Sequence, residues 1–184
     1  MKQIILGVTG SIAAYKAADL AHLLIKEGYE VEVILTENGA KFITPLTFRS
    51  LTHNPVHTEM FRDDFPKEIK HISLAEKADA VLIAPATANI IGKLVAGIGD
   101  DMLSTTLLAV KDKPVLIAPA MNTNMWENPI VQENIAKLRK YGYRFIEPRE
   151  SLLACGTLGK GALAAPEDII KAVKAAVEQR DDET

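Results

Sequence analysis

The sequence has few of the residues that build disulfide frameworks, metal clusters or membrane spans. Its 184 residues include one cysteine, Cys155, which excludes an internal disulfide and any metal site that needs several cysteines. The Cys155 thiol therefore either packs as an inert side chain or takes part in a reaction. Apolar runs are also short, because none approaches the roughly 20 residues that a membrane helix needs. We expect a cytoplasmic protein with no membrane partner.

An excess of either charge is missing as well. The 21 basic and 24 acidic residues leave a net charge of −3, and the basic residues are scattered along the chain. Because nucleic-acid binding needs concentrated positive charge, we expect no nucleic-acid partner. The length and the 48% hydrophobic content suit one well-packed domain. We therefore expect a single domain over residues 1–184, with a flexible tail at about 179–184.

Strand and helix patterns alternate along the chain. The apolar run QIILGVT (3–9) predicts a strand, and a helical pattern then runs from Ser11 to near Gly28. The β-branched EVEVILT (30–36) follows at once, which completes a strand–helix–strand unit and implies a parallel sheet.

The sextet VLIAPA occurs twice, at 81–86 and at 115–120, and predicts two more inner strands, with YRFIEP (143–148) as another. Helices are expected between these strands, at roughly 38–50, 87–96, 101–111, 128–140 and 167–178. The predicted fold is a Rossmann-like, doubly wound parallel sheet in a three-layer α/β/α arrangement.

A polar tail follows each copy of the sextet. We expect the proline in each copy to stop ladder pairing and to turn the chain outward. Because parallel sheets bind ligands beyond the carboxyl ends of their strands, the residues that follow should face one crevice: Thr87, Ala88 and Asn89, then Met121 and Asn122. The alternative is that two buried strands share a common apolar composition and nothing more.

The first turn, GVTGSIAAYK (7–16), favours an anion site. It places small residues where a strand passes into a helix, which lets backbone N–H groups approach a phosphate: Gly7, Gly10 and Ala13. The spacing G-x-x-G-x-x-A differs from the dinucleotide pattern G-x-G-x-x-G, so a mononucleotide fits better. A dinucleotide stays possible, because Glu37 directly after Thr36 could serve as the acid that binds the ribose. A purely structural alternative is a helix capped by Ser11.

Four blocks in order carry a family resemblance: GVTGSIAAYK, HISLAEKADAVLIAPATANIIGKLVAGIGDDMLS, PAMNTNMW and LLACGTLGKG. Over about residues 3–170 the sequence resembles the homo-oligomeric flavin-containing cysteine decarboxylases. The resemblance implies a Rossmann-like FMN-binding fold assembled as trimers or dodecamers. It also implies decarboxylation of a small molecule, 4′-phosphopantothenoylcysteine of coenzyme A biosynthesis, or of a peptide that ends in cysteine.

The resemblance also assigns roles to residues near the flavin. It implies that FMN contacts three loops and the second sextet: Gly10, Ser11, Ile12, Thr36, Thr87, Ala88, Asn89 and Ala120. It matches His71 to the catalytic histidine, whereas His22, His53 and His57 match nothing comparable.

The PAMNTNMW block is expected to hold the substrate carboxylate. Asn122 is matched to the group that binds it, flanked by Met121 and Met125. An amide donates to a carboxylate without a fixed positive charge that would oppose loss of CO₂. Trp126 is expected to serve packing or an interface.

The implied chemistry gives the thiol a role. Flavin oxidation of the cysteine moiety gives a thioaldehyde, loss of CO₂ then gives an ene-thiolate, and Cys155 donates a proton during the final reduction. Neighbours of Cys155 are expected to contact substrate: Ala154, Gly156 and Lys160. The loop departs from the family pattern, which has an acid, an arginine and a methionine where this chain has Thr157, Ala162 and Leu163. Lys160 would partly replace the missing arginine in anchoring the substrate, as a point charge.

Several alternatives stay open at this point. They are a peptidyl-cysteine decarboxylase, a non-catalytic FMN-binding regulatory subunit, a flavin prenyltransferase, which should lack PAMNTNMW, and a dinucleotide-dependent reductase. Many family members carry a fused ligase domain after this region, so the sequence is expected to be a stand-alone decarboxylase or part of a longer protein.

Overall fold

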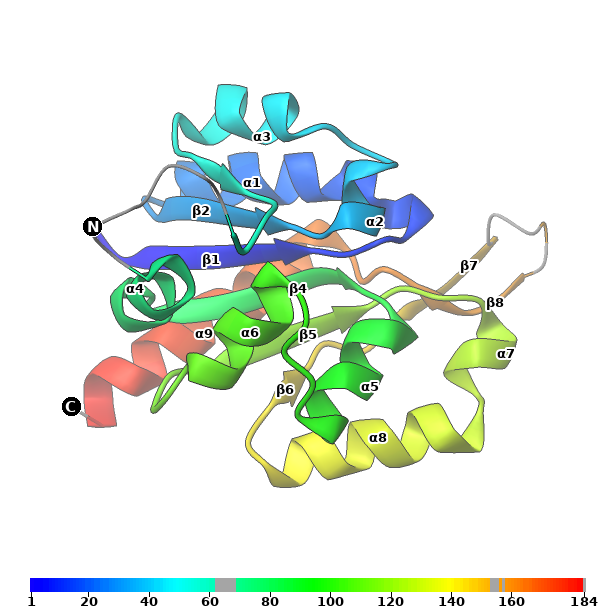
Figure 1. Ribbon diagram of the computed structural model, residues 1–184. Helices are drawn as coiled ribbons and strands as arrows, with labels where there is room; N and C mark the ends of the chain where they lie inside the picture. Colours follow the sequence, from blue (N-terminus) through cyan, green and yellow to red (C-terminus); the bar gives the residue numbers. More distant parts are fainter. Residues whose placement is uncertain (62–68, 153–155, 157, 184) are drawn as a thin grey trace.

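The computed structural model describes residues 1–61, 69–152, 156 and 158–183. A six-stranded parallel sheet lies between two layers of helices (Figure 1), which confirms the predicted α/β/α fold. The strand order is β3-β2-β1-β4-β5-β6, so the chain reverses its direction of travel across the sheet between β1 and β4. The strands are β1 (Gln3–Val8), β2 (Glu30–Leu35), β3 (Val56–His57), β4 (Ala80–Ala86), β5 (Val115–Pro119) and β6 (Arg144–Phe145).

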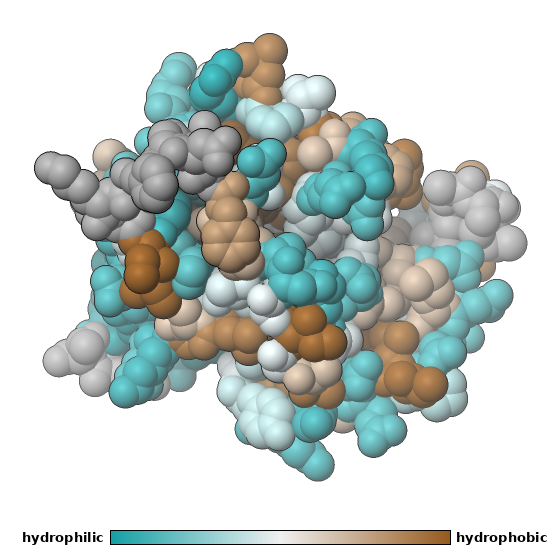
Figure 2. Space-filling model, in the orientation of Figure 1, coloured by the Kyte–Doolittle hydropathy of each residue, from teal (hydrophilic) through white to brown (hydrophobic). Residues whose placement is uncertain are grey.

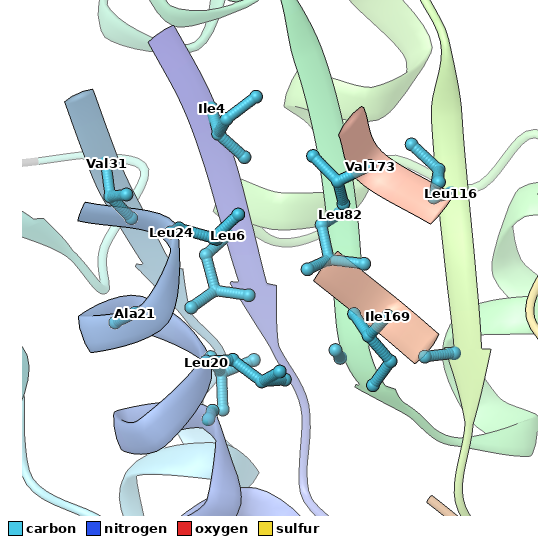
Figure 3. Packing of buried hydrophobic residues seen from close by; sticks show 14 of the residues in the cluster. Ile4, Leu6, Leu20, Ala21, Leu24, Val31, Leu82, Leu116, Ile169 and Val173 are labelled. Atoms are coloured by element: carbon cyan, nitrogen blue, oxygen red, sulfur yellow. The ribbon is translucent and has the colours of Figure 1, made fainter. Parts of the chain in front are cut away.

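Alternate residues of the strands build two separate cores. In β1, Ile4 and Leu6 face one layer, made of α1 (Lys16–Lys26), α3 (Pro45–Thr52) and α9 (Pro166–Glu183). Figure 3 shows Leu6 and Leu82 packed against side chains of α1 and α9. Ile5 faces the other layer, made of α4 (Lys70–Lys77), α5 (Ala88–Ala96), α6 (Met102–Ala109) and α8 (Pro129–Lys140). Because both faces of the sheet are covered, its central strands are apolar throughout, as the two copies of VLIAPA predicted.

Three details differ from the sequence-based prediction. The expected helix at 38–50 is two helices, α2 (Glu37–Ala40) and α3, because Pro45 begins α3 and holds the preceding Thr44 extended. Pro85 does not end its strand, because it lies within β4 and Ala86 still pairs with Pro119 after a shift of register. Pro119, by contrast, is the last residue of β5, as expected. The strand expected at 143–148 is only Arg144–Phe145.

A small antiparallel hairpin completes the fold beyond the carboxyl end of the sheet. Its strands are β7 (Arg149–Leu152) and β8 (Leu158–Ala162), which project past the ends of β4 and β5 in Figure 1. The short helix α7 (Thr123–Trp126) lies beside β8. In the described part of the chain, no helix is both long enough and apolar enough to cross a membrane.

Candidate active site

A cavity of about 540 Å³ lies where β1, β4 and β5 end, next to the point at which the strand order reverses. This is the position where open parallel sheets bind ligands. Its lining is mostly apolar, with a few polar groups, and comes from four segments of chain: Gly10, Ser11, Ile12, Ala13, Tyr15 and Lys16; Thr87 and Ala88; Ala120, Met121, Asn122 and Met125; and Ser151, Leu152, Gly161, Ala162 and Leu163.

The turn after β1 begins a helical segment that points its amino end at the cavity. The hydroxyl of Ser11 accepts a hydrogen bond from the Ala13 N–H at 3.2 Å, and a 3-10 turn (Ile12–Tyr15) leads into α1. Gly10 is needed for close packing, because a Cβ there would lie 2.5 Å from the Cβ of Asn38. The predicted Ser11 cap is therefore confirmed, and it coexists with a cavity at the same turn.

Thr9 ties this turn to the end of β4. Its buried hydroxyl donates to the Pro85 carbonyl oxygen at 2.6 Å and accepts from the Thr87 N–H at 3.1 Å. Thr87 in turn caps α5, since its hydroxyl accepts from the Ile90 N–H at 3.4 Å. The ends of β1 and β4 are thus held at a fixed separation, and the amino ends of two helical segments face the same space.

The PAMNTNMW block supplies the third wall. The Ala120 N–H donates to the Ala86 carbonyl oxygen at 3.0 Å, which sets this loop beside the first copy of the sextet. Asn122 is the N-cap of α7, where its Oδ1 accepts from the Asn124 N–H at 2.8 Å. Met125 is 47% exposed at the cavity, whereas Trp126 is 7% exposed within the core, as expected for a packing residue.

The hairpin closes the fourth side and is joined to β5 by backbone contact. The Met121 N–H donates to the Gly161 carbonyl oxygen at 2.9 Å. A Cβ on Gly161 would lie 2.2 Å from the Met121 carbonyl oxygen, and its φ is +143°, so glycine alone fits without strain.

Of the residues that the resemblance assigned to flavin or substrate, most lie together at this cavity. They are Gly10, Ser11, Ile12, Thr87, Ala88, Ala120, Met121, Asn122 and Met125. Thr36 instead caps α2 through the Gly39 N–H, and Asn89 is exposed in the first turn of α5. Neither lines the cavity.

Lys160 and His71 also lie elsewhere. The Lys160 ammonium is 3.0 Å from Glu147 Oε2 and 5.5 Å from the centre of the Trp126 ring. Burial would raise the pKa of Glu147, but hydrogen bonds from Lys160 and Arg139 outweigh it and lower that pKa. Lys160 is thus engaged by an ionised carboxylate beside the cavity and does not line it.

His71 lies in the first turn of α4, away from the cavity. The preceding residue, Lys70, is paired with Glu32, which lies opposite Ile5 of β1. The cavity begins beyond Val8, past the carboxyl end of that strand. Within one chain, His71 and Asn122 therefore do not meet.

The remaining predicted residues concern the cysteine loop. Ala154 and Cys155 lie outside the described residues, and so does Thr157. Gly156 is exposed with a φ of +81°, a conformation that favours glycine.

Sequence reasoning did not assign several of the lining residues to the site. Tyr15 and Lys16 were within the quoted GVTGSIAAYK block, and their position one helical turn after Ser11 was the available signal. Ser151 and Leu152 carried no local signal, because they reach the cavity only through the return of the hairpin.

The cavity fits a flavin mononucleotide. The amino ends of the helical segments that begin after Ser11 and after Thr87 suit a phosphate. The Thr87 N–H itself is already donated to the Thr9 hydroxyl. The apolar surface from Ile12, Ala120 and Met121 suits a flat aromatic ring, and the volume lies in the range of cofactor sites. These residues would hold the phosphate at the turn and the ring against β5.

The sequence matches the Flavoprotein family over residues 1–178. It is 49% identical over 174 residues to a probable phosphopantothenoylcysteine decarboxylase of Streptococcus mutans, covering 94% of this chain and 97% of that protein. It is 51% identical over 170 residues to the coenzyme A biosynthesis bifunctional protein CoaBC of Bacillus subtilis, covering 92% of this chain. The chain spans only 42% of that bifunctional protein.

Two solved structures have closely similar folds. One is a mutant PPC decarboxylase complexed with pantothenoylaminoethenethiol, with a TM-score of 0.83 and 32% identity over 95% of this chain and 97% of that one. The other is the FMN-dependent cysteine decarboxylase SpaF, with a TM-score of 0.86 and 31% identity over 98% of each chain.

Proposed function

The chain belongs to the Flavoprotein family, and from that premise we propose that it decarboxylates 4′-phosphopantothenoylcysteine to 4′-phosphopantetheine in an FMN-dependent reaction. The membership bears out the resemblance to flavin-containing cysteine decarboxylases, and relatives named for this activity or for coenzyme A biosynthesis are about half identical to the chain. The observation that carries the proposal is the cavity itself, which joins the two helical starts to Asn122 in one space.

Bound FMN supplies the oxidation that makes loss of CO₂ possible, and later the matching reduction. The residues of the chain itself bind the cofactor and orient the substrate. The amino ends of the helical segments after Ser11 and after Thr87 would hold the phosphate, and Ile12, Ala88 and Ala120 would exclude water from the ring. Asn122 orients the substrate carboxylate with a neutral amide, so no fixed cation has to be left behind when CO₂ departs.

We assign the two proton-handling steps to His71 and Cys155. His71 would act as the base at the substrate, and the Cys155 thiol would protonate the ene-thiolate carbon during the return of hydride. Since His71 does not line the cavity of its own chain, we propose that it serves the cavity of a neighbouring copy in a homo-oligomer, a trimer or a dodecamer.

Exposed apolar side chains support an oligomer. In Figure 2 hydrophobic groups reach the surface at several places on the face covered by α4, α5, α6 and α8. Ile72 of α4, Ile98 after α5 and Leu108 of α6 are 37%, 45% and 48% exposed. Further apolar residues line the mouth of the cavity, with Ile12 and Tyr15 each 58% exposed. Surfaces of this kind mark interaction sites. The proposed location is the cytoplasm, where this substrate would be made and used.

The test is direct. Purified protein should show the absorbance of oxidised flavin and release CO₂ from 4′-phosphopantothenoylcysteine. The His71→Asn variant should keep the flavin spectrum and lose CO₂ release, and a Cys155→Ser variant should accumulate the oxidised ene-thiol product. A colourless protein that ignores added FMN would overturn the proposal.

A second candidate is a peptidyl-cysteine decarboxylase, because the solved structure of the peptidyl-cysteine decarboxylase EpiD matches this fold with a TM-score of 0.80 and 25% identity. A peptide ending in cysteine, supplied as the competing substrate, separates the two. Turnover of the peptide at a higher kcat/KM than the small molecule would favour the second candidate.

A further inference from the structure

Glu32 forms a nearly buried polar cluster that the cavity does not use. It lies in β2, and its carboxylate is 13% exposed. Its Oε1 accepts from Gln3 Nε2 at 2.7 Å, and its Oε2 lies 2.7 Å from His57 Nε2 and 3.8 Å from Lys70 Nζ. A carboxylate can only accept, so the His57 ring donates through Nε2.

The cluster is charged at neutral pH. Burial would raise the pKa of Glu32, but the hydrogen bond from His57 and the charge of Lys70 outweigh it, so that pKa is lowered. Removing one partner of such a buried group leaves the others unsatisfied, which makes the arrangement rigid.

The two basic partners stand at opposite ends of one stretch of chain. His57 is the last residue of β3, and Lys70 is the first residue of α4. Glu32 therefore fixes the chain where it leaves the sheet and again where it re-enters a helix. Residue 71, the proposed base, comes directly after the second of these points.

Within the described residues, the first turn of α4 has no side-chain cap, although Leu74 and Ala75 bury the middle of the helix. The N-cap position is occupied by Ile69, whose side chain cannot accept a hydrogen bond. Ser73 donates to the Lys70 carbonyl oxygen at 3.2 Å, which closes the first turn onto Lys70 itself. Core packing of Leu74 and Ala75 fixes the body of α4, and the contact between Lys70 and Glu32 adds a tie at its first turn.

From this geometry we infer that Glu32 is a positioning residue for His71, acting through Lys70 and the first turn of α4. The inference rests on the proposed function, because it gives the orientation of the proposed base a physical cause. Small errors in the placement of a proton-transfer group reduce turnover strongly, by up to about 100-fold for a displacement of about 1 Å.

Flavin binding should be independent of this cluster. Glu32 pairs with Ile5 in the middle of the sheet, whereas the cavity begins beyond the ends of the strands. A defect that acts through His71 therefore predicts a fall in kcat with little change in KM or in FMN affinity. General loosening of the fold would instead lower flavin content and thermal stability together.

The experiment compares Glu32→Gln and Lys70→Met with the matched control Glu30→Gln, which changes an exposed acid two residues earlier in the same strand. Both test variants should lower kcat for CO₂ release about tenfold or more, with FMN affinity within about twofold of the wild type. The double variant should be no slower than the slower single variant, because both act through one ion pair. Lys70→Arg should recover most of the kcat that Lys70→Met loses.

Opposite results overturn the inference. Full kcat in folded Lys70→Met would remove the positioning role. So would a joint loss of flavin, Tm and kcat in Glu32→Gln where Glu30→Gln keeps all three. Failure of the proposed function is a different result: wild-type protein loaded with FMN would then release no CO₂, and His71→Asn would change nothing.

Discussion

The Thr87 N–H donates a hydrogen bond to the hydroxyl of Thr9 across 3.1 Å, joining the residues that follow two neighbouring strands. The same hydroxyl donates to the Pro85 carbonyl oxygen, so one buried group satisfies an acceptor in β4 and the N–H of the residue that follows the strand. The separation of the two helical starts at the cavity depends on this contact.

Thr9→Val should remove the bridge while it preserves the shape of the side chain. The buried Thr87 N–H would lose its partner, at a cost of about 1–3 kcal/mol in the free energy of unfolding, and FMN affinity should fall as the two loops separate. Urea unfolding and a flavin titration measure both effects. Thr9→Ser keeps the hydroxyl and should stay within about 1 kcal/mol of the wild type; equal losses in the two variants would show that the hydroxyl is not the cause.

Gly161→Ala should detach the hairpin from β5. The added Cβ would lie 2.2 Å from the Met121 carbonyl oxygen in a backbone conformation with φ of +143°. We expect a loss of about 1–3 kcal/mol of stability and a marked fall in substrate turnover. Gly92→Ala is the control, because a Cβ in that helix meets nothing within 4 Å and alanine favours helices. A fully active Gly161→Ala enzyme would contradict the contact.

Asn122→Asp should distinguish the role of Asn122 in capping α7 from its proposed role in binding the substrate. The aspartate keeps the oxygen that caps α7 but places a negative charge where the substrate carboxylate is proposed to bind. Stability should change little, whereas kcat/KM should fall at least about tenfold, a loss of roughly 1.4 kcal/mol. Asn128→Asp changes an N-cap with the same local hydrogen bond at α8, 2.9 Å to the Ile130 N–H, away from the cavity. It should leave kcat/KM near the wild-type value.

Asp101 should contribute acid-dependent stability. Burial alone would raise the pKa of its carboxyl, but hydrogen bonds from Lys93 and the Ser104 N–H outweigh it, so the folded-state pKa is lowered. A lowered folded-state pKa means that the unfolded chain binds more protons, so this stability is present above the ordinary aspartate pKa of about 3.9 and is lost as the pH falls through the folded-state value.

Asp101→Asn tests this dependence, because asparagine caps helices about as well as aspartate but carries no charge. Urea unfolding at neutral pH should show a modest loss, and the variant's stability should fall less steeply than that of the wild type below about pH 4. Parallel curves for the two proteins over that interval would exclude the assignment. Asp100→Asn removes the more exposed partner of Lys93 without touching the cap, so its effect at neutral pH should be smaller.

Much of the site could be predicted because its signals are local. Ser11 and Thr87 act within three residues of their own helices, and the spacing of Gly10 and Ala13 describes one turn. The crevice followed from one topological rule, that parallel strands deliver the residues after them to the same edge. Thr36, predicted to contact FMN, does not line the cavity, because its own cap of α2 gives the same local signal and does not reveal where the loop points.

The sequence by itself determined the parallel α/β architecture, the caps, and the pairing of two apolar strands with polar tails, since each depends on periodicity or on residues a few positions apart. Tertiary structure alone decided that the hairpin returns to Met121 and that Glu32 gathers partners from Gln3, His57 and Lys70. It also decided that Asn122 lines the cavity whereas His71 does not. Those relationships join residues separated by tens of positions. They are fixed by which surfaces pack together, and no local pattern of residues records that choice.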